Sequence, residues 1–341
     1  MHLQKLAFVL EDFAVGTPGQ QLQDRFLIGY PRDGAFHRFS SLKVFAWTSG
    51  QGLETRERDF GLIRPKSLEE ALAGADAVVV AGRADGAGPN EGLLTSVLER
   101  TPSGAACFVY GALASTLNTA KHLVALARKQ KIYLASGTSV ATTFRLPDID
   151  IAAGTSFTEA LIVVQGTSPL AELLALDGLL PVLERRRGSE AGVRSARRIE
   201  GDNVWRAGDE GIWPWPLLAS AISRSDTPQG DPERDGRTQD LVGLGLVPKL
   251  ARNPRASVIE YRDGLRAVLL VLDGVTTDFN FAARARDGAV ISAQLYRPPP
   301  PARAEFDRLA AVLERFFETG REPWPIQRSL ITAEILERIR S

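Results

Sequence analysis

The sequence predicts an α/β protein of two domains. A doubly wound parallel sheet is expected over residues 1–145, and an α+β domain with a mostly antiparallel sheet over residues 146–341. Three observations support this. Short apolar runs alternate with amphipathic stretches in the first half, the alternation stops near Arg145, and Asp-Gly turns separate extended runs in the second half. The length of 341 residues also fits two domains of roughly 100–200 residues each.

In the first half, apolar runs of about five residues are long enough for buried strands and too short for buried helices. The expected strands are Leu6–Leu10, Leu42–Trp47, Ala77–Ala81, Ala105–Val109 and Ile132–Ala135. Helical spacing of apolar residues places helices at Gln20–Gly29, Ser67–Ala73, Glu91–Glu99 and Asn118–Lys129. Strands that alternate with helices indicate a parallel sheet with helices on both faces.

The second half is read as strands at Phe157–Gln165, Val193–Ile199, Ala256–Tyr261, Arg266–Leu272, Phe279–Arg284 and Val290–Tyr296. Helices are expected at Pro169–Arg187, Leu217–Ser223, Ala304–Glu318 and Ser329–Arg340. The Gly/Trp/Asp stretch Trp205–Trp215 and the polar stretch Asp226–Asp240 are interpreted as loops. This pattern favours an antiparallel sheet with a helix layer on one face.

Composition and charge exclude several classes of function. Lys+Arg and Asp+Glu both number 41, which argues against a nucleic-acid or anionic-membrane partner. The single Cys107 excludes a disulfide framework and a cysteine zinc site, and three scattered histidines predict no metal site. No apolar run approaches the roughly 18 residues of a membrane span, and the N-terminus lacks a signal-peptide core. We therefore expect a cytoplasmic protein.

The central strand Ala77–Ala81 locates the expected site. In an open parallel sheet, ligands bind outside the carboxyl ends of the strands, which here gives the segment Arg83–Glu91. The loop after the first strand offers Gly16 and Gly19 of a G-x-G-x-x-G dinucleotide fingerprint, with an ordinary βα turn as the alternative. Thr48 and Ser49 stand where an acidic residue would hold the ribose. The domain is thus Rossmann-like with a degenerate fingerprint, and NAD or NADP is its expected cofactor.

Several segments resemble the glucose–fructose oxidoreductase/inositol dehydrogenase/MocA family, and most closely a divergent bacterial branch of it. They are Asp24–Tyr30, Gly88–Glu91, Glu184–Val193, Glu200–Trp205, Asp278–Arg284 and Glu322–Arg328. The resemblance covers nearly the whole chain. It implies an NAD(P)-dependent enzyme acting on a sugar or polyol, with oligomer contacts through the sheet of the second domain.

The chain departs from this family at the catalytic positions. The resemblance places Gly111 where the family has its lysine, and Leu174 where it has an acid/base histidine. General acid/base groups typically contribute about 10²–10⁴-fold each. The alternative function is therefore a catalytically inactive member that scaffolds or regulates a partner enzyme. Such a member should expose a large apolar face on the second-domain sheet. A sensor that binds a nucleotide or sugar without turnover is a further alternative.

Candidate site residues each have a structural alternative. Tyr110 and Glu91 are the catalytic candidates, with core packing and a favourable charge at a helix N-terminus as the alternatives. Arg83 is a candidate cofactor ligand or a solvated rim residue. Asn90, Arg145, Asp202 and Trp205 are the candidate substrate-binding residues. The last two pair a carboxylate with an aromatic ring, as sugar sites do, but also suit a domain-junction loop.

Overall fold

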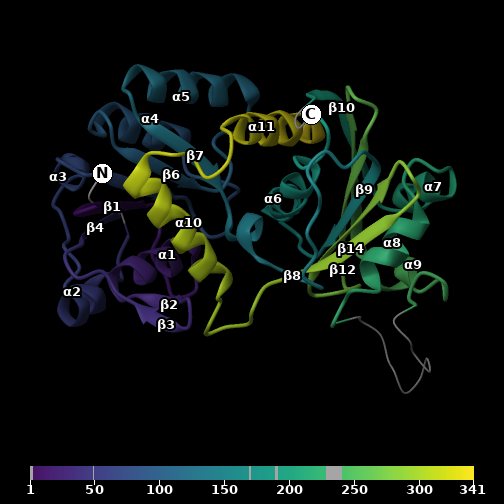
Figure 1. The fold of residues 1–341 in the computed structure, drawn as a ribbon, viewed down its shortest axis with the longest axis horizontal. Coiled ribbons are helices and arrows are strands. Elements are labelled where there is room, and N and C mark those ends of the chain that lie inside the picture. Colours follow the sequence, from purple (N-terminus) through teal and green to yellow (C-terminus); the bar gives the residue numbers. More distant parts are fainter. Residues whose placement is uncertain (1–2, 49, 169, 189–190, 228–239) are drawn as a thin grey trace. The chain divides into compact units, whose positions relative to one another are not determined.

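The computed structural model describes residues 3–48, 50–168, 170–188, 191–227 and 240–341, and two β-sheets organise them (Figure 1). Unit 1 comprises residues 1–142 and 298–333, and unit 2 comprises residues 143–297 and 334–341. The predicted boundary at 145/146 lies three residues beyond the first crossing between the units. The second crossing, back into unit 1 at residue 298, was not expected from the sequence.

Unit 1 contains a fully parallel sheet in the strand order β4-β1-β5-β6-β7. Its strands are β1 (Lys5–Leu10), β4 (Lys43–Thr48), β5 (Ala77–Ala81), β6 (Ala106–Tyr110) and β7 (Tyr133–Gly137). Its helices are α1 (Pro18–Leu27), α2 (Glu54–Phe60), α3 (Leu68–Leu72), α4 (Glu91–Arg100), α5 (Leu117–Lys129) and α10 (Glu305–Thr319), with a short 3₁₀ turn at Ser139–Thr142. The predicted doubly wound sheet is confirmed. The small hairpin β2 (Tyr30–Arg32) and β3 (Ala35–His37) and helix α2 were not predicted.

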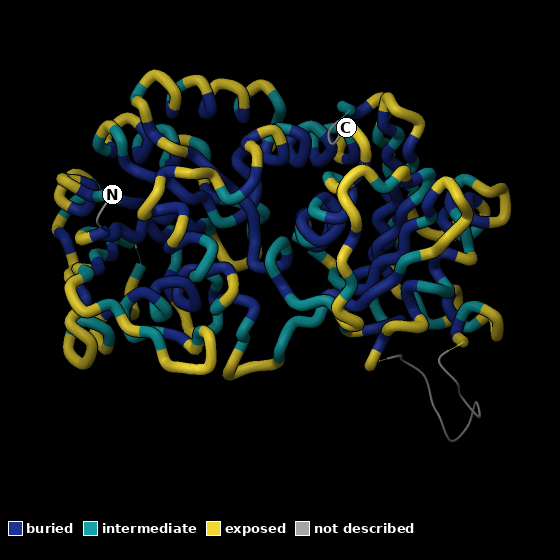
Figure 2. The backbone as a smooth tube through the Cα atoms, in the orientation of Figure 1, coloured by how far each residue is buried: buried dark blue, intermediate teal, exposed yellow. Residues whose placement is uncertain are grey.

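The alternation of side chains along β1 explains the layers of unit 1. Leu6, Phe8 and Leu10 share one core with α1 and α10, whereas Ala7 and Val9 share the other with α3, α4 and α5. Figure 2 shows the sheet as a continuous buried layer. Helix α10 buries its Phe306, Leu309, Leu313, Phe316 and Phe317 in the first of these cores. For this reason it belongs to unit 1, although the sequence placed it in the second domain.

Unit 2 contains a mixed sheet in the strand order β10-β11-β12-β9-β13-β14-β8. The strands are β8 (Phe144–Leu146), β9 (Phe157–Val164), β10 (Val193–Glu200), β11 (Arg252–Tyr261), β12 (Arg266–Asp273), β13 (Phe279–Ala285) and β14 (Val290–Tyr296). Only the β12–β9 pair is parallel, so the predicted mostly antiparallel sheet is confirmed. The last helix, α11 (Gln327–Arg340), begins in unit 1 and ends in unit 2.

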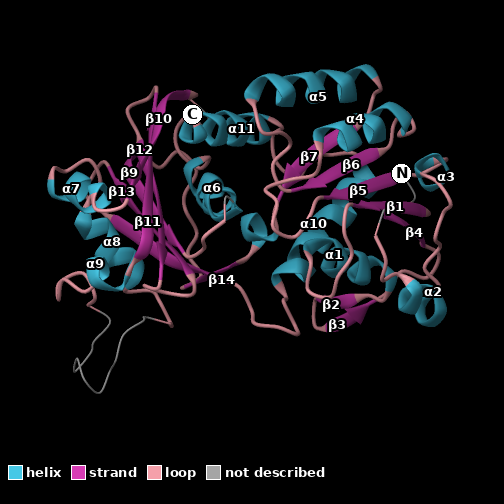
Figure 3. Cartoon of the chain, turned by 180° about the vertical axis from the view of Figure 1, so that it is seen from behind, coloured by secondary structure: helices cyan, strands magenta, loops and turns pink. Residues whose placement is uncertain are grey.

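Helices from the chain itself cover both faces of this sheet. Helix α6 (Leu170–Leu183) packs against β9 and β12, and α7 (Asn203–Asp209), α8 (Trp215–Ile222) and α9 (Val247–Leu250) lie on the other side (Figure 3). Leu217 and Leu218 of α8 share a core with Leu161 and Val163 of β9. The prediction that an inactive member would expose a large apolar face of this sheet is therefore wrong for this chain, because α7, α8 and α9 cover that face.

The two segments of the second half that were predicted as loops have different outcomes. The expected loop Trp205–Trp215 is wrong in its first part, since α7 contains Trp205 and buries Val204 and Ala207 at helical spacing. Gly208 and Asp209 led to the prediction of a loop here, because both residues are poor helix formers. Most of the other expected loop, Asp226–Asp240, lies outside the described residues.

Candidate functional site

Most of the predicted site residues of unit 1 lie along the side of its sheet where the carboxyl ends of all the parallel strands meet. Gly16 and Gly19 follow β1, Thr48 ends β4, Arg83, Asn90 and Glu91 follow β5, and Tyr110 ends β6. Ser49 lies outside the described residues. The structure therefore gathers the unit 1 candidates at the edge expected from the sequence.

The loop between β1 and α1 has two features of a dinucleotide fingerprint. A Cβ atom on Gly19 would lie 2.9 Å from a terminal methyl of the Leu10 side chain, so this glycine lets α1 pack closely on β1 without moving that side chain. Gly16 has φ +89°, and a Cβ there would meet nothing within 4 Å. The pattern is Ala14-x-Gly16-x-x-Gly19, which keeps the second and third glycines of the fingerprint.

This loop fits the diphosphate of NAD(P). The open space at Gly16 allows a phosphate to approach the backbone, and the N-terminus of α1 favours negative charge. Thr17 caps the helix by accepting a hydrogen bond from the Gln20 N–H at 3.4 Å, and its hydroxyl lies at the same end. Pro18 at the first helical position removes one N–H donor, so fewer backbone donors face the site than in a loop without proline.

Two carboxylates that were not predicted tie this loop to the one after β5. Glu11 accepts a hydrogen bond from the Asn90 N–H at 2.6 Å, and Asp12 accepts one from the Ala84 N–H at 3.2 Å. Glu11 and Asp12 directly follow the β1 strand, and this position is the only sequence signal for their role.

Among the described residues after β4, Arg56 and Arg58 offer the ribose no charged group without a partner in the chain. Thr48 accepts a hydrogen bond from the Gly50 N–H at 3.1 Å. Arg56, whose charge would suit the 2′-phosphate of NADP, makes two hydrogen bonds to Asp24, and Arg58 pairs with Asp59. The described part of this edge therefore does not discriminate between NAD and NADP.

Three glycines allow the backbones of the loops after β5 and β6 to pack in direct contact. A Cβ on Gly82 would lie 2.4 Å from the Gly88 carbonyl oxygen, and one on Gly88 would lie 2.3 Å from the Ala112 carbonyl oxygen. A Cβ on Gly111 would lie 2.5 Å from the Ala87 carbonyl oxygen, and φ at Gly111 is +112°. The Ala112 N–H donates to this same carbonyl at 2.7 Å. Gly111 therefore has no room for a side chain, and the lysine of the resembled family has no place there.

Tyr110 is the phenol at this edge. Its hydroxyl lies 3.4 Å from the Ser139 hydroxyl, and its ring stacks on Phe306 of α10 with centroids 6.0 Å apart. The side chain is half-buried, so the ring packs while the hydroxyl stays within reach of the strand ends. Ser139 was not predicted, because a serine in a Gly-Thr-Ser turn carries no signal of its own.

Asn90 caps helix α4, and the Glu91 side chain binds the loop before α5. The Asn90 side chain accepts hydrogen bonds from the Gly92 and Leu93 N–H groups, which makes it the N-cap. Glu91 accepts from both the N–H and the hydroxyl of Ser115, at 2.8 and 2.6 Å. The Asn90 contacts are those of a helix cap, and the Glu91 carboxylate joins the start of α4 to the loop before α5. Arg83 is 70% exposed and lies 3.6 Å from Asp85.

The unit 2 candidates are not brought together. Arg145 lies in β8 at one edge of the sheet, whereas Asp202 and Trp205 lie at α7, which packs on β10 and β11 at the opposite edge. Trp205 stacks on Trp215 with centroids 6.0 Å apart, as part of the aromatic packing of the α7–α8 layer. Leu174 of α6, at the family's histidine position, is an aliphatic side chain that cannot transfer a proton.

Within the described residues, no group of three or more His, Cys, Asp or Glu side chains is arranged to hold a metal ion. None of the described helices has the length and apolar character needed to cross a bilayer.

Comparisons with known proteins identify the fold. No family model matches the sequence, and no curated protein matches it. Among solved structures, myo-inositol dehydrogenase from Lactobacillus casei, in complex with NAD(H) and myo-inositol, matches with a TM-score of 0.59 at 13% identity, over 99% of this chain and 94% of that one.

Two further structures match over nearly their full lengths. Biliverdin reductase from Synechocystis, in complex with biliverdin and NADP⁺, has a TM-score of 0.57 at 13% identity and covers 98% of both chains. UDP-N-acetylglucosamine 3-dehydrogenase from Acidithiobacillus ferrooxidans has a TM-score of 0.56 at 13% identity, over 98% of this chain and 96% of that one. The chain therefore has the two-domain fold of the glucose–fructose oxidoreductase/inositol dehydrogenase/MocA oxidoreductases.

Proposed function

We propose that this chain binds NAD or NADP at the loop between β1 and α1 and acts on, or binds, a sugar- or polyol-like ligand. The observation that carries the proposal is the Gly16–Gly19 loop, in which one glycine allows close helix packing and the other leaves open backbone. Solved structures with the same fold hold NAD(H) or NADP⁺, and one of them also holds myo-inositol.

The bound cofactor would supply hydride transfer, and the chain would supply binding and proton handling. The N-terminus of α1 would hold the diphosphate, which would replace the Gln20 side chain as acceptor of the Gly16 N–H and the Ala14 carbonyl as acceptor of the Thr17 hydroxyl. Tyr110 is the group proposed to hold or move a proton, because its hydroxyl lies beside Ser139 at the ends of β6 and β7. Leu174 and Gly111 cannot take this role.

Titration of the purified protein with NAD(H) and NADP(H) tests the cofactor proposal. We expect saturable binding, and we expect Gly16→Val to weaken it at least tenfold, since a branched side chain would fill the space that the diphosphate needs. Gly61→Val is the matched control, because Gly61 also has positive φ and open space but lies at the end of α2. Equal affinities of the two variants, or no binding by the wild type at millimolar cofactor, would refute the proposal.

Turnover tests the role of Tyr110. With a panel of sugars and polyols and the bound cofactor, we expect Tyr110→Phe to lower kcat about 10²-fold or more while cofactor affinity stays unchanged, because only the hydroxyl is removed. Phenylalanine keeps the stack on Phe306, so a loss of folding is not expected. An unchanged kcat would remove Tyr110 from the mechanism.

The second candidate function is a non-catalytic protein that scaffolds or regulates a partner enzyme. The specific observation in its favour is Gly111, where packing against the Ala87 carbonyl excludes any side chain. This function predicts no turnover, whether or not the protein binds the cofactor. The partner would not dock on the apolar face of the unit 2 sheet, because α7, α8 and α9 cover it. Detectable turnover in the panel above would eliminate this candidate.

A further inference from the structure

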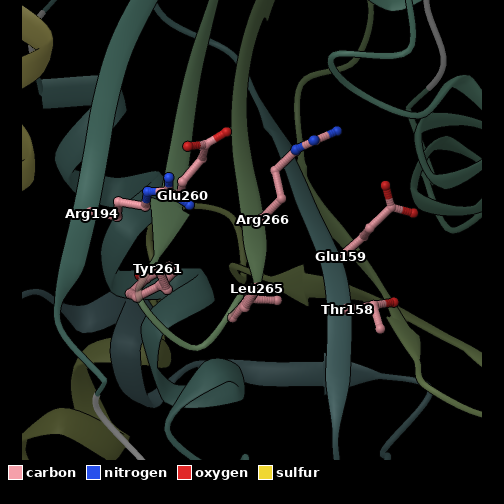
Figure 4. Close-up of a pocket in the computed structure, with 8 residues that line it drawn as sticks. Thr158, Glu159, Arg194, Glu260, Tyr261, Leu265 and Arg266 are labelled. Carbon is pink, nitrogen blue, oxygen red and sulfur yellow. The ribbon is translucent and has the colours of Figure 1, made fainter.

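A hollow of about 460 Å³ lies on the sheet of unit 2 (Figure 4). It is found where β9 and β12 begin and β11 ends, near the β11–β12 turn. Its lining residues are Thr158, Glu159, Arg194, Glu260, Tyr261, Gly264, Leu265 and Arg266. The volume lies within the range of about 300–1,000 Å³ of small-molecule sites. None of these residues was singled out from the sequence.

Strand register arranges the charges of this hollow in a row. Glu260 of β11 pairs with Arg266 of β12, Arg266 pairs with Glu159 of β9, and Glu159 pairs with Arg284 of β13. Residues directly opposite each other on neighbouring strands point to the same face. Figure 4 shows the side chains of Glu260, Arg266 and Glu159 on one side of the sheet. Acidic and basic groups therefore alternate across four adjacent strands.

Contacts within the chain use only part of the hydrogen-bonding capacity of these groups. One oxygen of Glu260 accepts from the Ser195 hydroxyl at 3.0 Å, and one oxygen of Glu159 lies 3.3 Å from the Arg284 guanidinium. One terminal nitrogen of Arg266 donates to the Gly211 and Ile212 carbonyls. Among the described residues, the second carboxylate oxygens and the other terminal nitrogen of Arg266 have no partner.

Arg194 completes the hollow. It lies in β10 at the bulge between Val193 and Ser195, and its side chain is exposed with no ion pair among the described residues. Two guanidinium groups and two carboxylates thus line the space, with a net charge of zero. A ligand with one charge would be attracted by one pair and repelled by the other. A ligand with both charges can pair with both sets, and charge-assisted hydrogen bonds are the strong ones.

We propose that this hollow binds a small zwitterion that carries an ammonium and a carboxylate group, in the manner of an amino acid. Glu260 accepts from the ammonium group, and Arg194 and Arg266, on the two strands beside it, donate to the carboxylate. The site lies within unit 2 and does not depend on the function proposed for unit 1.

Calorimetric titration with glycine, β-alanine and γ-aminobutyrate tests the proposal, because these probes differ mainly in the distance between their two charges. At least one is expected to bind in about the millimolar range or tighter. Acetate, methylamine and N-acetylglycine are the comparison ligands, because each lacks one of the two charges, and each is expected to bind about tenfold more weakly or not at all. No binding of any zwitterion, or equal binding of acetate and methylamine, would overturn the proposal.

Variants assign the binding to this hollow. Glu260→Gln keeps the shape and can still accept from Ser195, and Arg194→Gln alters an exposed side chain, so both should fold. Each is expected to weaken zwitterion binding about tenfold or more. Arg197→Gln, on the same strand but outside the hollow, is the control and should bind as the wild type does. Equal affinity of all three variants would place the binding elsewhere. Cofactor titration of the same samples keeps this result separate from the unit 1 proposal.

Discussion

Gly111 shows how a single residue constrains the chemistry of this chain. The position that the family resemblance assigned to a lysine has φ +112° and faces the Ala87 carbonyl. This combination could not be read from the sequence, where Gly111 is only a glycine after a strand. The loss of the lysine is thus built into the backbone path of two neighbouring loops.

Substitution of this glycine by alanine measures the constraint. Gly111→Ala introduces both positive-φ strain and a backbone clash, whereas Gly104→Ala introduces only the strain, since nothing lies within 4 Å of a Cβ there. Overpacking typically costs about 1–3 kcal/mol, so the Gly111 variant should lose that much more free energy of unfolding than the Gly104 variant. Urea denaturation checks this. Similar losses in the two variants would show that the loops after β5 and β6 separate easily.

Cys107 gives a prediction about pH. Burial raises the pKa of its thiol from 9.0 to about 12. The protonated form is favoured in the folded state, so this contribution to stability is present below pH 9 and is lost as the pH rises from 9 to 12. Between pH 8 and 10 the wild type should therefore lose about 1 kcal/mol more unfolding free energy than Cys107→Ala. Urea titrations at both values provide the measurement, and parallel pH profiles would contradict it.

The layer formed by α7, α8 and α9 is the element that most distinguishes the structure from the sequence reading. Its order depends on close packing of indole rings. The buried Trp213 donates to the Val204 carbonyl at 2.8 Å, and a Cβ on Gly208 would lie 2.6 Å from the Trp213 ring. These contacts join the end of α7 to the start of α8. The Gly and Asp residues suggested a loop because their effect on local propensity is visible in the sequence, whereas the packing is not.

Trp213→Phe tests this layer. Loss of the indole N–H leaves the buried Val204 carbonyl without that donor, which should lower the free energy of unfolding by about 1–3 kcal/mol. Trp205→Phe is the control, because Trp205 is half-buried and makes no hydrogen bond through its indole among the described residues. Chemical denaturation compares the two. A larger loss for the Trp205 variant would mean that its ring, and not that of Trp213, holds the layer.

The strands of this protein could be predicted from the sequence, but contacts between distant strands could not. Apolar runs such as Ala77–Ala81 specify buried strands, so the parallel sheet of unit 1 and the mostly antiparallel sheet of unit 2 were predicted, whereas the short strands β2, β3 and β8 were not. Convergence at the strand ends of unit 1 followed from parallel topology. The charge row of Glu260, Arg266 and Glu159 could not be predicted, because it depends on register between strands distant in the chain. The N-cap role of Asn90 was easier to expect, because Asn90 directly precedes the predicted helix Glu91–Glu99 and asparagine is a preferred N-cap residue.

For the molecule as a whole, the assignment of α10 to unit 1 matters most. Its amphipathic pattern predicted a helix but not which sheet it covers, since either unit could accept an apolar stripe. The answer depends on contacts between residues almost three hundred positions apart, such as the hydrogen bond from Arg25 to Asp307 at 2.8 Å.

A truncation experiment follows from this assignment. A fragment of residues 1–145 lacks the aromatic residues of α10 that fill one face of its sheet. We expect it to bind a hydrophobic dye and to melt without a cooperative transition. Joining residues 298–333 to it through a flexible linker should restore cooperativity. A cooperative transition of the short fragment, measured by calorimetry, would show that α10 is dispensable.

The return of the chain to unit 1 at residue 298 also has a consequence during synthesis on the ribosome. Roughly 190 residues separate the end of the first segment of unit 1, at 142, from the end of its second segment, at 333. At translation rates of about 5–20 residues per second, the first sheet waits roughly 10–40 s with the part of one face that α10 covers still exposed. Its apolar surface is available to chaperones for that period. The nascent N-terminal unit should thus depend on such protection more strongly than the finished protein does.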